Sequence, residues 1–311
     1  MKRFFVKFSV FALALLLPFA AYFAYVQAQP ASFGKSLMGG AQHKLEVLAS
    51  TKSPKIVIIG GSGAPYAVIS EDVQNALGMP CINLGTTAYL GLEFYFAQLK
   101  GNLGDGDIVI IAPEYSMYEN GIDYETVWMA AENRASVIKK LPLSYVPNML
   151  TSFSRYAKSK LGALKTDGAS PLTYDEQYTA AGYGYWGDIT FDRDCILESG
   201  YNTQDTRTVT ADIVTDEVIN QLNAVAAYAG KCGAEVYLTY ATFDRLALID
   251  GIDGVNALEA RLEAECDIKR LGNLSDGVMD EKYFYNTNNH LNSEGAKVRT
   301  AALISDLNEA P

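Results

Sequence analysis

The sequence predicts an α/β protein built on a mainly parallel five-stranded sheet. Short apolar runs at 56–59, 81–84, 108–112, 234–240 and 266–269 read as strands. Near-continuous apolar strands are typical of a parallel sheet that is covered on both faces. Stretches with helical spacing lie between the runs, and this alternation predicts right-handed crossovers. We therefore expect one domain over residues 29–311.

The connecting segments justify the assignment in chain order. Helical spacing occurs at 41–49, 66–77, 90–99, 209–229, 255–265 and 292–307. Gly78 is expected to end the second of these helices, and Asn292 is a good N-cap for the last.

Residues 116–208 break this rhythm and form a tyrosine-rich insert after the third strand, with 124–164 expected to be mostly helical. Its rings either face a substrate groove or pack the insert on the sheet. They are Tyr118, Tyr124, Trp128, Tyr145, Tyr156, Tyr174, Tyr178, Tyr183, Tyr185 and Trp186.

The N-terminal 28 residues form a separate segment. Lys2, Arg3 and Lys7 precede an almost wholly apolar stretch at 8–26, and 26–28 is a small-x-small cleavage pattern. The segment is a secretory signal or an uncleaved membrane anchor, and the length of the apolar run favours the anchor. Either interpretation places the body outside the cytoplasm.

Charge and cysteine usage narrow the possible partners. Without the first 28 residues, 22 basic and 36 acidic residues leave a net charge of −14. An acidic body argues against nucleic acid, and against an anionic membrane surface, as a partner. Cys81, Cys195, Cys232 and Cys266 lack metal-site spacing. Cys232 and Cys266 each precede a predicted strand, so a disulfide between them is one possibility.

A serine at the end of the first strand is the strongest chemical signal. In KIVIIGGSGAP, glycines 60 and 61 allow a sharp turn that leaves Ser62 at the carboxyl edge of the sheet. A serine nucleophile needs a base, and His290 is one of only two histidines. The backbone N–H groups of Ser62 and Gly85 are expected to stabilise an oxyanion, with the Asn83 side chain as a weaker option.

Plainer interpretations exist for each part. Ser62 could be an ordinary turn hydroxyl, and His290 could be a helix-cap residue without chemistry. A nucleotide-binding GGSG loop is a third interpretation. It is weak, because the third glycine, a ribose-binding acid about 20 residues on and a Walker lysine are all missing.

The order of these motifs resembles the SGNH/GDSL hydrolase superfamily. The pattern is a strand followed by GGS, NLG after the second strand, an acidic-Tyr strand end, and HLN-x-x-G before the last helix. It is most similar to the membrane-anchored extracytoplasmic branch that includes alginate O-acetylation and D-alanyl transfer proteins. The resemblance covers residues 55–115 and 209–308. It implies a flavodoxin-like three-layer fold, Ser62 as nucleophile, Gly85 as oxyanion donor and His290 as base, without cofactor or metal.

Two positions depart from the family pattern. Asn286 stands where an aspartate is expected before the histidine. An asparagine can orient an imidazole but cannot stabilise its positive charge. Glu114 and Tyr115 stand where the family often supplies an oxyanion asparagine. A carboxylate there either repels the oxyanion or orients His290. Together with Gly61, these two residues are expected to line the site.

Two functions follow from the resemblance. The first is a serine esterase or O-acyltransferase that acts, through an acyl-serine, on acyl esters of a cell-surface polysaccharide, with acylated carbohydrate and a membrane-bound acyltransferase machinery as partners. The second is a catalytically weak relative that binds glycan or supports an export assembly. Asn286 and Glu114 favour the second.

Overall fold

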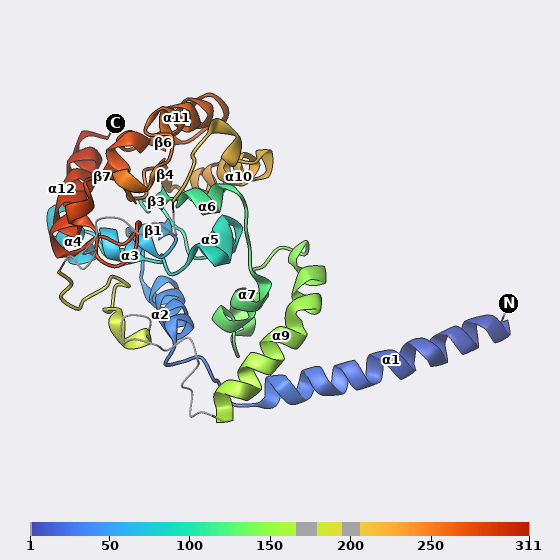
Figure 1. The fold of residues 1–311 in the computed structure, drawn as a ribbon. Coiled ribbons are helices and arrows are strands. Elements are labelled where there is room, and N and C mark those ends of the chain that lie inside the picture. Colours follow the sequence, from blue (N-terminus) through green and yellow to red (C-terminus); the bar gives the residue numbers. More distant parts are fainter. Residues whose placement is uncertain (1, 166–178, 195–205, 311) are drawn as a thin grey trace.

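A single parallel sheet lies at the centre of the molecule (Figure 1), in a computed structural model that describes residues 2–165, 179–194 and 206–310. Its five strands run in the order β2-β1-β3-β4-β6, all parallel to their neighbours. This strand order is that of flavodoxin-like folds, so the predicted fold class is confirmed. The strands are β1 (Ile56–Gly60), β2 (Cys81–Asn83), β3 (Ile108–Ala112), β4 (Glu235–Leu238) and β6 (Lys269–Arg270).

Helices cover both faces of the sheet. Successive residues of a strand point to opposite faces, and here the side chains on both faces are apolar, so each face needs a covering layer. Val57 and Ile59 belong to the core on one face, and Ile56 and Ile58 to the core on the other. The first face carries α2 (Leu37–Ser50), α5 (Gly91–Leu99), α10 (Asp216–Lys231) and α11 (Asp253–Glu265). The second carries α3 (Gly63–Ala67), α4 (Ser70–Leu77) and α12 (Ser293–Glu309).

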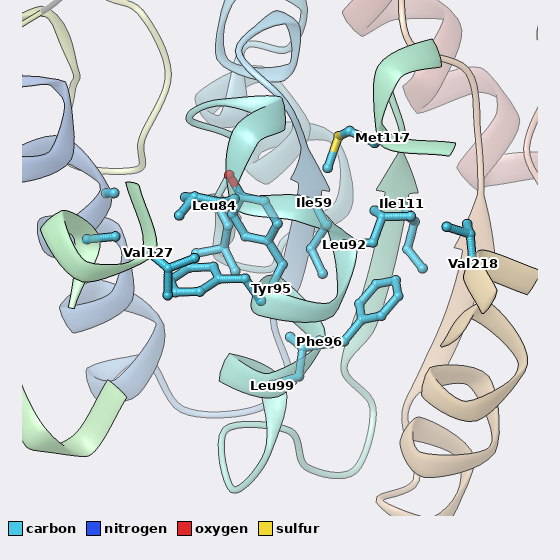
Figure 2. Packing of buried hydrophobic residues seen from close by; sticks show 14 of the residues in the cluster. Ile59, Leu84, Leu92, Tyr95, Phe96, Leu99, Ile111, Met117, Val127 and Val218 are labelled. Carbon is cyan, nitrogen blue, oxygen red and sulfur yellow. The ribbon is translucent and has the colours of Figure 1, made fainter. Parts of the chain in front are cut away.

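Large side chains fill the first face. Figure 2 shows Leu92 and Phe96 of α5 beside Ile59 of β1 and Ile111 of β3. At the amino end of the sheet, the buried Lys55 ammonium pairs with Asp107 at 2.7 Å. The same carboxylate accepts the Lys55 backbone N–H at 2.9 Å. This pairing joins the starts of β1 and β3, the strands whose opposite ends carry the site.

The helix expected over 66–77 is broken into α3 and α4. Val68 and Ile69 between them are extended, and the break is held by bonds to distant parts of the chain. The Ile69 N–H donates to the Thr300 hydroxyl at 2.9 Å. The Ser70 hydroxyl donates to Asp188 at 2.8 Å. Helical spacing did not reveal these tertiary contacts.

Residues 115–165 fold mostly as helices, as the sequence predicted for 124–164. They form α6 (Tyr115–Tyr118), α7 (Tyr124–Ala130), α8 (Ala135–Ile138) and α9 (Tyr145–Lys165). The rings of Tyr118, Trp128, Tyr145 and Tyr156 are buried in the core, whereas Tyr185 is exposed. Tyr174 and Tyr178 lie outside the described residues. A small second sheet pairs β5 (Phe243–Asp244) with β7 (Val278–Met279).

The N-terminal helix α1 (Lys2–Ala28) projects away from the body (Figure 1). Residues 3–28 are long and apolar enough to cross a membrane, a property that a signal sequence shares. Its last turns pack on the body: the Phe23 ring lies 4.7 Å from the Phe153 ring of α9, and Val26 is fully buried.

The possible disulfide between Cys232 and Cys266 does not form. Strands β4 and β6, which follow the two cysteines, are neighbours as expected, yet both thiols are free. Cys232 ends α10 and interacts with the Tyr228 side chain, and Cys266 packs against the edge of the core. Cys81 is also a free thiol, and Cys195 lies outside the described residues.

Candidate active site

Ser62 lies directly after β1, in the turn that leads into α3. A Cβ at position 61 would meet the Glu114 carboxylate at 2.3 Å, so Gly61 leaves room for that side chain beside the turn. The end of β1 places the Ser62 hydroxyl at the carboxyl edge of the sheet, where open α/β sheets bind ligands.

His290 is held in a closed loop ahead of α12. The Tyr285 N–H donates to the His290 carbonyl at 2.8 Å, and the His290 N–H donates to the Thr287 hydroxyl at 3.1 Å. The Asp244 N–H donates to the Asn288 carbonyl at 2.8 Å, which fixes the loop to the segment after β4. The imidazole therefore takes its position from its own closed loop and from the segment after β4.

The sequence predicted three residues that the structure brings into one hydrogen-bonded chain. His290 Nε2 lies 3.0 Å from the Ser62 hydroxyl oxygen, and His290 Nδ1 lies 2.9 Å from Asn286 Oδ1. An amide oxygen only accepts, so Nδ1 carries the proton in this arrangement. Nε2 is then left to accept the Ser62 proton, which is the geometry of a serine nucleophile with its general base.

Tyr66 and Arg193 surround the other side of the imidazole. The Tyr66 ring stacks on His290, with centroids 4.0 Å apart and planes 2° apart. The Arg193 guanidinium donates to the Tyr66 carbonyl at 2.9 Å and to the Leu291 carbonyl at 2.9 Å. Burial, with a smaller contribution from the Arg193 charge, lowers the pKa of His290 to about 3. His290 is thus neutral, as a base must be, at all ordinary pH values.

The Glu114 carboxylate accepts hydrogen bonds from two donors next to the serine. Its Oε1 accepts the Gly63 backbone N–H at 2.6 Å and lies 3.5 Å from the Ser62 hydroxyl. The Asn289 side-chain amide donates to Oε2 at 3.4 Å. The carboxylate is buried and accepts from both of these donors. Glu114 therefore lies beside Ser62, and the residue that bonds to Nδ1 of His290 is Asn286.

Gly85 and Asn83 do not present the donors expected of them. The Gly85 N–H donates to Asn83 Oδ1 at 3.1 Å, and Asn83 Nδ2 donates to the Ala64 carbonyl at 3.0 Å. Asn83 therefore ties the end of β2 to the serine turn, whereas the Gly85 bond is local to the segment after β2. In this conformation both donors are engaged in bonds within the protein.

A cavity of about 390 Å³ opens beside Ser62. Tyr115 lines it, as predicted, with its ring edge-on to Phe243 at 5.3 Å. Tyr89 lies at the wall of the cavity and is 67 % exposed. The main lining residues are Ser62, Thr87, Tyr89, Glu114, Tyr115, Glu119, Arg207, Thr242, Phe243 and Asn289. The cavity is large enough for a small acyl ester with part of its alcohol.

Tyr66, Arg193 and Asn289 were not found from the sequence. Asn289 directly precedes His290, so adjacency alone could have suggested it. Arg193 carries no local signal, because it bonds to residues 98 and 127 positions away. It also shows that the stretch after residue 178 contributes to the site, which its tyrosine content did not indicate.

Comparison with known proteins adds no assignment. No protein-family model matches the chain, and no curated protein is detectably similar to it. Among residues 2–165, 179–194 and 206–310, no group of three histidine, cysteine or acidic side chains could hold a metal ion. The chemistry of the site therefore has to be argued from its own geometry.

Proposed function

We propose that the protein is an extracytoplasmic serine esterase or O-acyltransferase of the SGNH type. The observation that carries this proposal is the chain from Ser62 through His290 to Asn286, with contacts of 3.0 and 2.9 Å. It lies at the carboxyl edge of a parallel sheet and beside a cavity. The order of the motifs along the chain supports the family assignment.

The reaction proceeds in two acyl transfers. His290 Nε2 accepts the Ser62 proton while Oγ attacks the acyl carbonyl, and the same nitrogen then returns the proton to the departing alcohol. An acyl-serine remains. A second hydroxyl, from water or a sugar, loses its proton to His290 and attacks the acyl group. Its product is a free acid or a new ester, and Ser62 regains its proton.

The acyl group comes from a cell-surface or exported polysaccharide in this proposal. The family resemblance and the apolar N-terminal helix support a substrate outside the cytoplasm. The exposed Tyr89 ring at the cavity wall offers a flat surface of the kind on which sugars stack. The acetyl group is the smallest such acyl group, and the cavity accommodates it.

A second candidate function rests on Glu114. Its carboxylate already accepts the Gly63 N–H, and a negative charge there opposes an oxyanion at the same place. Asn286 adds to this effect, because it provides no charge to stabilise an imidazolium. On this alternative, the protein binds acylated glycan or supports an export assembly without turning over ester.

Labelling with a fluorophosphonate distinguishes the two functions. The reagent bonds to a serine only when its hydroxyl is activated as a nucleophile. Full-length protein in membranes would be labelled beside Ser62→Ala and His290→Ala variants, and p-nitrophenyl acetate hydrolysis measured on the same samples. We expect labelling and hydrolysis in the wild type and the loss of both in each variant.

The matched control is Ser305→Ala, which removes an exposed hydroxyl on α12 far along the chain from the site. It should label as the wild type does. Wild-type protein that labels no faster than Ser62→Ala would overturn the enzymatic proposal and leave the binding function.

A further inference from the structure

An apolar stripe on α9 is left uncovered beside the helix that leaves the body. Leu143 precedes α9 and is 88 % exposed, and Val146 and Leu150 on the helix are 46 % and 47 % exposed. Residues 146, 150, 153 and 157 follow each other at helical spacing, so they share one face. The first two are open and the last two are buried.

Helix α1 covers the buried part of the same face. The rings of Phe19 and Tyr22 each lie 6.0 Å from the Phe153 ring, and Phe23 lies closer. The stripe of α9 therefore continues directly into the contact with α1. In Figure 1, α1 and α9 diverge from this contact, and the first half of α9 lies on the side of the body toward which α1 projects.

The charge around the stripe differs from that of the whole chain. Residues 133–165 contain seven basic residues and no acidic one, whereas the body as a whole is strongly acidic. Lys139 precedes Leu143 and is exposed, and the exposed Lys158 and Lys165 follow Leu150 by about two and four helical turns. Three of the other basic residues pair with acids of other segments: Arg134, Arg155 and Lys160. An apolar helix face with exposed lysines on the same helix is typical of a helix that lies in the headgroup region of an anionic bilayer.

We propose that the stripe formed by Leu143, Val146 and Leu150 docks onto the bilayer that α1 spans. The occupant is the phospholipid interface. Three observations support this choice: the stripe continues an existing contact with the apolar helix, it lies on the side of α1, and exposed lysines precede and follow it along the chain. The net negative charge of the body argued against a membrane surface as a partner. That net charge is a sum over the whole body and hides the basic segment at 133–165.

A photoreactive residue tests the contact directly. p-Benzoylphenylalanine replaces Leu143 or Leu150 in the full chain, which is reconstituted into vesicles of phosphatidylcholine and phosphatidylglycerol. The control positions are Ile249 and Val298, which are 64 % and 44 % exposed elsewhere on the body. After illumination, mass spectrometry measures the fraction of protein that carries a lipid adduct. The substituted positions are exposed, so folding is checked only by comparing melting temperatures with the wild type.

We expect several-fold more lipid adduct from positions 143 and 150 than from 249 and 298. The yield at position 150 should fall in vesicles of phosphatidylcholine alone, because the lysines then lose their anionic partners. Adduct yields equal to those of the controls would overturn the proposal. Crosslinks to a second copy of the chain in place of lipid would overturn it too, and would identify the stripe as a protein interface. The readout does not depend on the catalytic activity of the site.

Discussion

Asn286 sets how well His290 serves as a base. It fixes the imidazole through a bond of 2.9 Å but brings no charge to the imidazolium that the proposed acyl transfer would form. In a serine protease, the change from aspartate to asparagine at the equivalent role costs about 10⁴ in kcat. Arg193 increases the difficulty, because its charge disfavours a second positive group nearby. The chain from Ser62 to Asn286 is therefore in place, but the transition state of the proposed reaction lacks a negative charge that would stabilise the imidazolium.

Asn286→Asp should raise kcat for p-nitrophenyl acetate by at least about tenfold, since a carboxylate stabilises the imidazolium. The pKa of His290 should rise from its wild-type value of about 3. Activity requires neutral His290, so the acidic limb of the pH–rate profile should move to higher pH in the variant. Rates measured between pH 4 and 9 check both changes. A variant slower than the wild type, with an unchanged profile, would contradict this role for Asn286.

Glu114→Gln should also increase activity. The amide keeps the shape of the side chain, and its oxygen can still accept the Gly63 N–H, but the negative charge is removed. Because that charge opposes an oxyanion on Ser62, its loss should accelerate fluorophosphonate labelling by roughly tenfold or more. Labelling rates of the two proteins at pH 7 test this. If labelling is slower in the variant, Glu114 assists the reaction and the charge is useful.

At the scale of single elements, α12 connects stability to the site. Asn292 caps this helix: its Oδ1 accepts the Gly295 N–H at 2.9 Å, and its Nδ2 donates to the Lys282 carbonyl at 2.7 Å. The cap lies two residues after His290. It therefore fixes both the first turn of the helix and the end of the histidine loop.

Asn292→Ala should lower the free energy of unfolding by about 1 kcal/mol, the usual cost of losing a helix cap. It should also slow labelling of Ser62, because the His290 loop loses an anchor. Asn308→Ala, an exposed change near the end of the same helix, is the control and should alter neither quantity. Denaturant unfolding and labelling of both variants provide the check. Equal effects of the two changes would show that the cap does not matter.

Features that depend on nearby residues could be predicted from the sequence, whereas features that depend on distant contacts could not. The apolar runs predicted the parallel sheet and the positions of Ser62 and His290, because strand order places their loops at one edge. The break between α3 and α4 was not predictable, since it depends on bonds to Thr300 and Asp188. Arg193 was missed for the same reason. Gly85 and Asn83 were expected to serve an oxyanion, but the bonds that engage them depend on the direction of the Asn83 side chain, which a motif does not encode.

For the whole molecule, α1 is part of the packed structure as well as an apolar helix. Val26 is fully buried, and Phe23 contacts both Trp128 and Phe153. Removal of this helix would expose those aromatic rings to water. If the segment stays attached, as a membrane anchor would, it is part of the fold of the body.

Deleting residues 1–28 should therefore destabilise the region of α7 and α9. We expect a lower melting temperature and increased binding of a hydrophobic dye, because the apolar surface of Trp128 and Phe153 becomes accessible. The full chain in detergent is the reference. Intact-mass measurement of the protein from membranes gives an independent check and should find residues 1–28 still attached. A truncated chain that melts with the full one and binds no more dye would contradict the structural role of α1.

The buried ion pair between Lys160 and Glu132, at 3.1 Å, has a mechanical consequence. Glu132 also accepts the backbone N–H groups of Ser32 and Phe33 at 2.8 and 3.0 Å, immediately after α1. The segment that follows α1 is thus tied to the body within a few residues of the end of the helix and is not a loose tether. If α1 anchors the protein as proposed, this short link keeps the cavity beside Ser62 close to the bilayer surface.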